Sequence, residues 1–230
     1  MKVVAIVQAR MGSTRLKGKS LMKIGNYSLL EIVIRTVKRN TFVTDVIIAT
    51  SNLKEDDVIQ DLCVDKGYTC YRGDAADVLS RFLNIAKNLD NGDVIVRVTA
   101  DNPINNHKAS EKLFKYHLEQ NNDYTCVRGL SHTVYEYIRV EALLALRKAV
   151  GLTKTNREHV TSYFRERPQN FNTIQLEPSD LGVNTILDKL LTVDHKEDYE
   201  RFLRINENIN IDRIHDMERI YCYLSRNTLV

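Results

Sequence analysis

Short apolar runs alternate with longer amphipathic segments through the first half of this chain. The apolar runs at 3–7, 45–50 and 94–99 predict buried strands, with a minor one at 69–71. Spacing of apolar residues every three to four positions predicts helices over 29–38, 53–66, 76–89 and 107–121. Strands separated by helices of this length imply parallel βαβ crossovers. The sequence therefore predicts an α/β fold with a doubly wound, mostly parallel sheet.

The second half has a looser pattern. Strands are predicted over 123–127, 136–140, 171–176 and 190–193, and helices over 141–150, 156–166, 196–208 and 212–224. No segment rich in Pro, Gly or Ser separates the two halves. We therefore expect one domain over 1–230, in which residues 123–190 form an inserted, lid-like region.

Composition excludes several classes of protein. The net charge of +3 is too small to indicate nucleic-acid binding, and no basic stripe with interleaved aromatic residues occurs. No apolar run approaches the length that spans a membrane. The four cysteines form no CxxC pair, and no signal peptide is recognised, which predicts reduced thiols in a cytoplasmic protein.

A cationic loop follows the first apolar run directly. It carries Arg10, Arg15, Lys17 and Lys19, with Gly12 and Gly18 between them, and the first acidic residue of the chain is Glu31. In an open α/β sheet, such a loop at the carboxyl end of a buried strand binds phosphate. The alternative is a basic loop that is merely solvated.

Two well-known phosphate loops do not match this segment. GxGxxG is absent, which counts against a dinucleotide-binding oxidoreductase. In a P-loop, four residues separate the first Gly from GK[ST], whereas five separate Gly12 from Gly18 here. A P-loop also continues into a long helix, but Gly25-Asn26 interrupts the chain soon after Ser20. We therefore expect a different kind of phosphate loop.

Six blocks in order carry a resemblance to a known family: QARMGSTRLKGKSL, ATSNLKEDD, YRGDAADVLSRF, VRVTADNPI, REHVTSYF and LTVDHKEDYERF. Together they resemble the cytidylyltransferases of spore-coat polysaccharide type, which are relatives of the CMP-ketodeoxyoctonate and CMP-acylneuraminate synthetases. The match covers nearly the whole chain. It implies a Rossmann-like fold of the nucleotide-diphospho-sugar transferase type. It also implies transfer of CMP from CTP to a sugar, sugar acid or small phosphorylated acceptor, with release of pyrophosphate, for cell-surface glycans.

Transfer of a nucleotidyl group needs positive charge on the triphosphate more than covalent help. Arg10 and Arg15 offer forked donors that suit the β- and γ-phosphates, and Lys19 offers a compact charge. We predict Lys19 as the main catalytic cation and the two arginines as triphosphate clamps.

Further nucleotide contacts follow mainly from the resemblance, which places Ala9, Thr50, Asp77 and Ser80 near the nucleoside. Backbone groups of Gln8 and Ala9, at a strand end, could read a pyrimidine edge, and Gly12 lies in the phosphate loop. Asp77 could instead be an acid favoured by a helix dipole. For Arg81, contact with substrate and pairing with a carboxylate remain equally open.

The acceptor side is predicted at Arg97, Glu136, Arg157 and His159. Strand periodicity places Arg97 on the same face as Thr99 and Asp101, and the resemblance places the other three. Packing or capping remains an equal alternative for His159. Two features depart from the family: Lys17 replaces a proline of the loop, and Gly129 lies farther before Glu136 than the corresponding glycine.

Two aspartates are predicted to bind a divalent cation. Asp101 and Asp194 each follow a predicted apolar strand, and the carboxyl ends of parallel strands converge at one edge of a sheet. Mg²⁺, or Mn²⁺ in its place, commonly takes one or two carboxylates together with phosphate oxygens and waters. The alternative is that each aspartate caps the following helix.

The expected partners are thus CTP and a small-molecule acceptor, with no nucleic acid and no membrane; a homodimer is left open. Three other functions remain as alternatives. A guanylyl- or uridylyltransferase of the same fold is the nearest. A P-loop-like small-molecule kinase would use Lys19 and Ser20 and release ADP, and a non-catalytic nucleotide-binding module would release nothing.

Overall fold

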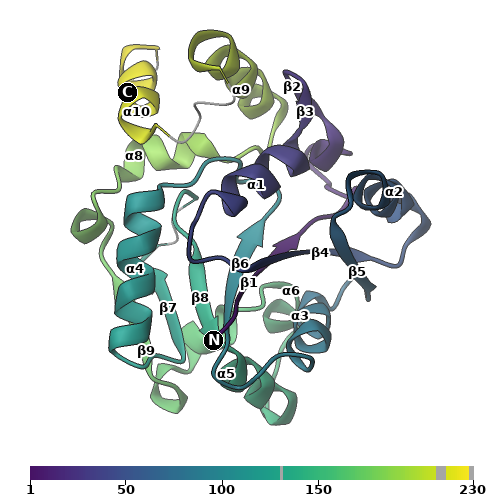
Figure 1. The fold of residues 1–230 in the computed structure, drawn as a ribbon, viewed down its shortest axis with the longest axis vertical. Coiled ribbons are helices and arrows are strands. Elements are labelled where there is room, and N and C mark those ends of the chain that lie inside the picture. Colours follow the sequence, from purple (N-terminus) through teal and green to yellow (C-terminus); the bar gives the residue numbers. More distant parts are fainter. Residues whose placement is uncertain (130–131, 211–215, 228–230) are drawn as a thin grey trace.

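The structure, a computed structural model, describes residues 1–129, 132–210 and 216–227. A seven-stranded sheet in the order β5-β4-β1-β6-β8-β7-β9 forms its centre (Figure 1). The strands are β1 (Val3–Gln8), β4 (Asp45–Ser51), β5 (Thr69–Gly73), β6 (Val94–Thr99), β7 (Tyr124–Val127), β8 (Glu136–Arg139) and β9 (Thr173–Leu176). The predicted α/β class is confirmed.

Strands β5, β4, β1 and β6 are parallel neighbours, whereas β8 is antiparallel to both β6 and β7. After β1 the chain first adds β4 and β5 on one side, and it then crosses to place β6 on the other side. The strand order therefore reverses at β1. In such sheets, ligands bind at the carboxyl edge beside this reversal.

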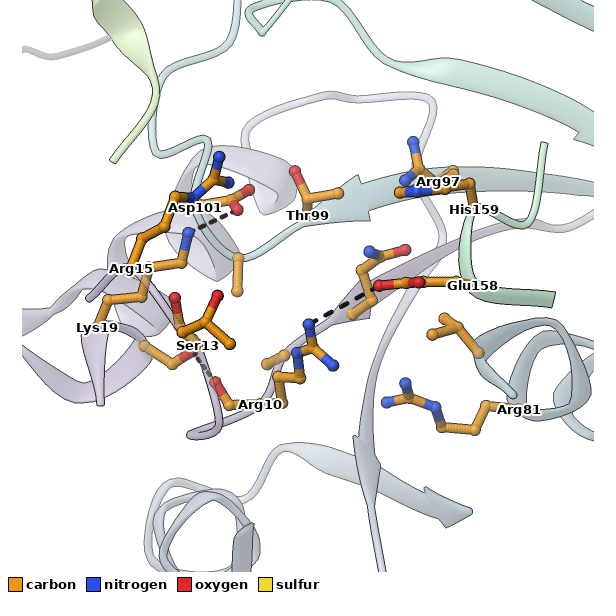
Figure 2. A pocket seen from close by; sticks show the side chains of 16 residues that line it. Arg10, Ser13, Arg15, Lys19, Arg81, Arg97, Thr99, Asp101, Glu158 and His159 are labelled. Carbon is orange, nitrogen blue, oxygen red and sulfur yellow. Dashed lines mark hydrogen bonds and ion pairs between the residues drawn. The ribbon is translucent and has the colours of Figure 1, made fainter. Parts of the chain in front are cut away.

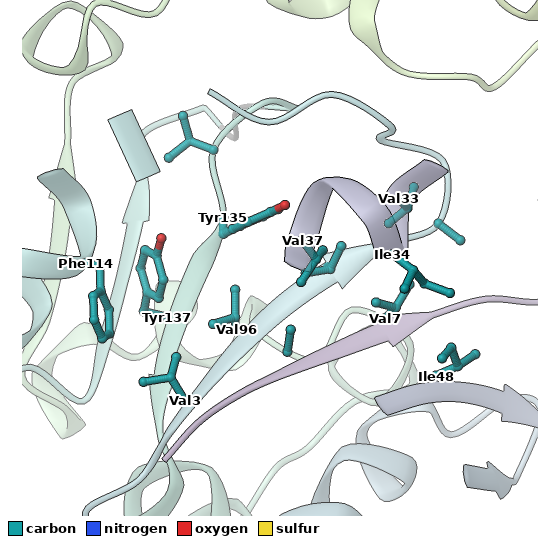
Figure 3. Packing of buried hydrophobic residues seen from close by; sticks show 14 of the residues in the cluster. Val3, Val7, Val33, Ile34, Val37, Ile48, Val96, Phe114, Tyr135 and Tyr137 are labelled. Carbon is teal, nitrogen blue, oxygen red and sulfur yellow. The ribbon is translucent and has the colours of Figure 1, made fainter. Parts of the chain in front are cut away.

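Helices cover both faces of the sheet because side chains alternate along each strand. Val3, Ala5 and Val7 of β1 pack in one core with α1 (Leu29–Lys38), α2 (Asp57–Lys66) and α4 (His107–Glu119) (Figure 3). Val4 and Ile6 face a second core with α3 (Val78–Ala86), α5 (Val140–Ala145) and α7 (Ser162–Glu166). The sheet is thus doubly wound, as predicted.

A third core lies beside the sheet. It joins a small hairpin, β2 (Lys23–Ile24) and β3 (Tyr27–Ser28), to α8 (Thr185–Asp188), α9 (Lys196–Ile209) and α10 (Met217–Asn227). Figure 1 shows α9 and α10 next to each other at the end of the molecule where this hairpin lies. Residues 212–215 of the helix predicted over 212–224 lie outside the described ranges. This core fixes the chain after the cationic loop and on both sides of Asp194.

The strand predicted over 190–193 is not formed. The chain makes a 3₁₀ turn at Lys189–Leu191 and then extends through Thr192. Leu191 and Val193 are apolar because they pack in the third core. Burial, and not strand pairing, accounts for this apolar run.

The single helix predicted over 156–166 is two helices, α6 (Lys154–Glu158) and α7. Helix α6 begins earlier because Thr153 and Asn156 form a capping box. The break lies at His159–Thr161, where Val160 and Thr161 are fully buried. The break places His159 at the rim of a cavity described below.

Residues 123–190 contribute β7, β8 and β9, which continue the central sheet beyond β6. The short segments between β8 and β9 include α5, the 3₁₀ turn Leu146–Lys148, α6 and α7. This region is thus continuous with the sheet. Its role on the acceptor side stays a prediction.

Candidate active site

The cationic loop leaves the carboxyl end of β1 and folds back on itself. The Gly18 N–H donates to the Met11 carbonyl at 3.0 Å, and the Ser20 hydroxyl donates to the Arg10 carbonyl at 3.0 Å. Gly18 has φ of +74°, a conformation that favours glycine. Asp56, which is buried, accepts the Met11 N–H at 2.6 Å. The loop is therefore tied to the protein at both ends.

Lys19 occupies the centre of the predicted site. Its Nζ lies 2.8 Å from Asp101 Oδ2 and 2.9 Å from Asp194 Oδ1, and it also donates to the Val193 carbonyl at 2.9 Å. Arg15 lies 2.8 Å from the same oxygen of Asp194. The predicted main cation and both predicted metal ligands thus meet at one point (Figure 2 shows Lys19, Arg15 and Asp101).

Neither aspartate caps a helix. Asn106 accepts the Ala109 N–H at the start of α4. Asp198, and not Asp194, accepts the backbone N–H groups at the start of α9. Neither carboxylate is therefore occupied as a helix cap, and both remain available to bind a ligand or a cation.

Asp101 lies directly beyond β6, and its own carbonyl accepts the Val193 N–H at 2.9 Å, which holds Asp194 alongside. Burial alone would raise the pKa of Asp101, but the ammonium of Lys19 outweighs burial and lowers that pKa. The Asp101 side chain therefore remains a carboxylate.

A cavity of about 410 Å³ opens beside this cluster, and Figure 2 shows its side chains. Arg15, Lys19 and Asp101 lie at one end, and Arg81 lies at the opposite end. Arg10 lies between them, 4.0 Å from Glu158. The lining residues are Gln8, Ala9, Arg10, Ser13, Thr14, Arg15, Lys19, Ser20, Val78, Arg81, Arg97, Thr99, Ala100, Asp101, Glu158 and His159. This volume lies within the range of small-ligand sites.

A second cavity of about 210 Å³ adjoins the first and shares Arg15, Arg97, Thr99 and Asp101 with it. Its other lining residues are Val98, Asn102, His132, Val134, Tyr135, Glu136, Thr192 and Asp194. Two ligands, one bound in each cavity, would therefore meet at these shared residues, which include Asp101.

Glu136 lies buried on the wall of the second cavity. Its carboxylate pairs with Arg97 at 2.6 Å and with Arg165 at 3.0 Å, and it accepts the Tyr124 hydroxyl at 2.6 Å. Thr161 lies 3.2 Å away. Burial alone would raise the pKa of Glu136, but the two arginines lower it. Glu136 thus holds Arg97 in place from beneath the cavity.

Several residues predicted near the nucleoside do not line the first cavity. Thr50 is fully buried beneath it. Asp77 caps α3 by accepting the Ser80 N–H at 2.8 Å, and it pairs with Arg157 at 2.7 Å. Gly12 faces Glu55 instead. The Lys19 cluster is therefore not joined by five predicted residues, and their roles stay predictions: Gly12, Thr50, Asp77, Ser80 and Arg157.

The backbone at the end of β1 is already hydrogen-bonded. The Ala9 N–H donates to the Ala49 carbonyl at 3.2 Å, and the Gln8 carbonyl accepts the Ala100 N–H at 3.0 Å. The Ala9 N–H and the Gln8 carbonyl are therefore not free to read a base, and a base contact at this end of β1 stays a prediction. The adjacent strands use them, because β1 is the central strand at this edge.

Several residues in or beside the two cavities were not predicted. Ser13 and Thr14 lie in the cationic loop and line the first cavity, so their position beside Arg15 was a usable signal. Glu158 precedes His159, which was predicted. Arg165 meets Glu136 only through the fold, and no local pattern reveals that contact.

The pair of aspartates fits a hard divalent cation. Both approach one cationic atom within 2.9 Å, so the structure already places a positive charge between them. Across the described ranges, no cluster of three or more His, Cys, Asp or Glu side chains suited to a metal is found. Two carboxylates with room beside them suit Mg²⁺ bound together with a phosphate. In the same ranges, no helix is long and apolar enough to cross a membrane.

A doubly wound sheet with a cationic loop and two carboxylates at its switch point defines a nucleotidyltransferase of the Rossmann-like type. Comparison with known proteins narrows the class. The family model described as cytidylyltransferase matches residues 4–222, and the chain belongs to this family. It is therefore an enzyme of the nucleotidyltransferase class.

Two relatives and two solved structures place the chain further. It is 36% identical to an uncharacterized protein of Methanocaldococcus jannaschii over 99% of this chain and 92% of the relative. It is 32% identical to the spore coat polysaccharide biosynthesis protein SpsF of Bacillus subtilis over 86% of this chain and 83% of that relative. A cytidylyltransferase from Leptospira borgpetersenii aligns with a TM-score of 0.84 at 25% identity, covering 99% of this chain and 95% of that structure. A CMP:2-keto-3-deoxy-manno-octonic acid synthetase complexed with CTP aligns with a TM-score of 0.66, covering 89% of this chain and 98% of that structure. Because the two sequences are only 13% identical, this likeness shows the fold alone.

Proposed function

We propose that this enzyme transfers CMP from CTP to a sugar, a sugar acid or a small phosphorylated acceptor, releases pyrophosphate and requires a divalent cation. The observation that carries the proposal is the Lys19 ammonium held between Asp101 and Asp194 at the mouth of the larger cavity. Nucleotidyl transfer needs such a concentration of fixed charge where the triphosphate breaks.

The cationic side chains and the two carboxylates of the site have different roles. Arg10, Arg15 and Lys19 supply positive charge for the β- and γ-phosphates, which leave as pyrophosphate. Asp101 and Asp194 would hold the divalent cation, Mg²⁺ or Mn²⁺, which would stabilise charge on the α-phosphate. The ammonium of Lys19, beside these carboxylates, would supply positive charge to the phosphates.

The smaller cavity is the place for the acceptor. It adjoins the larger cavity at Arg97 and Asp101, so an acceptor there faces a phosphate bound beside Lys19. Arg97 offers donors to hydroxyl or anionic groups of the acceptor, while Glu136 fixes the orientation of Arg97. His159 approaches from the wall of the larger cavity. The relative named for spore coat polysaccharide biosynthesis supports a glycan precursor as acceptor.

The kinase alternative has less support. Lys19 begins a 3₁₀ turn of three residues, Lys19–Leu21, and not a long helix. The hydroxyl of Ser20 donates to the Arg10 carbonyl and holds the loop together. A P-loop would instead offer that hydroxyl to a metal.

The proposal is tested by measuring pyrophosphate release with CTP, UTP, GTP and ATP against a panel of ulosonic acids, sugar 1-phosphates and other small phosphorylated acceptors. We expect release that requires CTP, Mg²⁺ and one class of acceptor. Preference for GTP or UTP would favour a guanylyl- or uridylyltransferase. Release of a nucleoside diphosphate would favour a kinase, and binding without any turnover would favour a non-catalytic module.

A further inference from the structure

Arg81 is a buried cation with unused hydrogen-bonding capacity. It projects from α3, only 2% of it is exposed, and it lines the larger cavity. One terminal nitrogen donates to the Ala49 carbonyl at 3.0 Å, whereas Nε has no partner. No carboxylate within the described part of the chain forms an ion pair with it.

A buried guanidinium that forms no ion pair and leaves a donor unmet is unfavourable in the free protein. A guanidinium carries five N–H donors, and an unmet buried donor costs stability. Burial lowers the pKa of Arg81 and Arg10 lowers it further, while the charges of Asp56, Asp74 and Asp77 offset this only in part. Such a group is retained at a cavity wall where a ligand supplies the missing acceptor.

The position of Arg81 in the cavity determines which part of a bound nucleotide it would contact. Lys19, Arg15 and Asp101 take the opposite end of the cavity, where the triphosphate and the metal belong (Figure 2). Arg10 lies between that end and Arg81. A nucleotide placed with its phosphates at Lys19 therefore extends its nucleoside toward Arg81. The acceptors on that part of a cytidine nucleotide are ribose hydroxyls and the base, of which the base carbonyl is the strongest.

We propose that Arg81 donates to the O2 carbonyl of the pyrimidine and thereby selects pyrimidine over purine nucleotides. This inference rests on the proposed function, because it takes the orientation of CTP from it. Cytosine and uracil share O2, so Arg81 does not distinguish them. Gln8 has an unpartnered buried Oε1 on the same cavity wall, where it can accept from an amino group.

The test compares affinities for CTP, UTP, ATP and 2-thio-CTP, in which sulfur replaces O2, by calorimetry without acceptor. The parent should bind CTP about ten- to a hundredfold more tightly than 2-thio-CTP, as expected for a hydrogen bond from a charged donor. Arg81→Met should weaken CTP and UTP alike by that factor, leave ATP unchanged and abolish the preference over 2-thio-CTP. Arg147→Met is the matched control, because Arg147 also donates to a backbone carbonyl, that of Leu83, but outside the cavity.

A second variant moves Arg81 without removing it. A Cβ added at Gly73 would lie 2.8 Å from Arg81 Cγ, so Gly73→Ala must displace that side chain. We expect Gly73→Ala to reduce the preference for CTP over 2-thio-CTP in the same direction, even if Arg81→Met does not fold.

Equal affinity of the parent for CTP and 2-thio-CTP overturns the inference. So does a loss of ATP and CTP binding by the same factor in Arg81→Met, which would place a phosphate at Arg81. Neither result affects the proposed function, which stands or falls on pyrophosphate release. Absence of binding by every nucleotide would overturn both.

Discussion

Replacing Lys19 with methionine tests whether its ammonium and the divalent cation share one site. The change removes the charge and the three contacts of Nζ but keeps most of the apolar stem. Asp101 and Asp194 then face each other with only Arg15 as a counter-charge. The free protein should therefore lose stability, and the carboxylates should become more available to a metal.

The size of this loss of stability follows from how deeply the ion pairs of Lys19 are buried. Removing one partner of a fully buried ion pair costs about 3–5 kcal/mol. Because the Asp101 and Asp194 side chains are 28% and 24% exposed, solvent reduces this to about 2–3 kcal/mol. For a domain of this size that lowers Tm by roughly 5–10 °C. A metal at about a hundred times its Kd restores about 2.7 kcal/mol.

The assay is thermal unfolding in EDTA and across a Mg²⁺ titration, paired with turnover of CTP. We expect Lys19→Met to unfold well below the parent in EDTA, to gain more Tm from Mg²⁺ than the parent does, and to turn over at least about 10²-fold more slowly. Lys17→Met, which removes an exposed lysine of the same loop, is the control and should change neither quantity. An equal Mg²⁺ response in Lys19→Met and the parent would refute the shared site, and near-normal turnover would remove Lys19 from the mechanism.

Three further outcomes are expected. Asp101→Asn and Asp194→Asn should unfold within a few degrees of the parent yet turn over CTP hundreds of times more slowly, and activity persisting in either variant would rule out its role as a metal ligand. Glu136→Gln should lose about 2–4 kcal/mol in urea unfolding, because it leaves two arginines, whose side chains are 15% and 25% exposed, without their carboxylate. The lowered pKa of Glu136 means that this contribution is present above about pH 4 and is lost as the pH falls further, so parent and variant should converge there. Burial lowers the pKa of His117 to about 3, so the unfolded chain binds its proton first and the folded protein loses about 1–2 kcal/mol between pH 7 and pH 5. His117→Gln should flatten that part of the profile, and an unchanged slope would show that His117 is protonated when folded.

Local periodicity was sufficient for the elements that form the sheet and its main helices. The helix predicted over 29–38 is α1 with the same bounds, because its apolar stripe and its Ser28 cap are both local features. Phosphate binding by the cationic loop was predicted from charge and glycine and stays a prediction, whereas its distinction from a P-loop is confirmed by the short turn after Gly18. These features depend on neighbours within a few residues.

Features that depend on distant parts of the chain were predicted poorly. Asp194 reaches the site because the N–H of the preceding Val193 donates to the Asp101 carbonyl and because Val193 packs in the third core. The strand expected before Asp194 is not formed. The pairing of Glu136 with Arg165 joins residues 29 apart in sequence across a helix break. A single sequence holds no local signal for such contacts. The same holds for the buried Nε of Arg81, which has no hydrogen-bond partner in the described ranges.

The most direct test of nucleotidyl transfer is ³¹P NMR of the enzyme with Mg²⁺, CTP and an acceptor that supports turnover in the panel. Attack at the α-phosphorus should produce pyrophosphate and a CMP-linked product in equal amounts, with no CDP. The same sample with EDTA should keep its triphosphate signals. Formation of CDP with a phosphorylated acceptor would show attack at the γ-phosphorus and would contradict the account of this site.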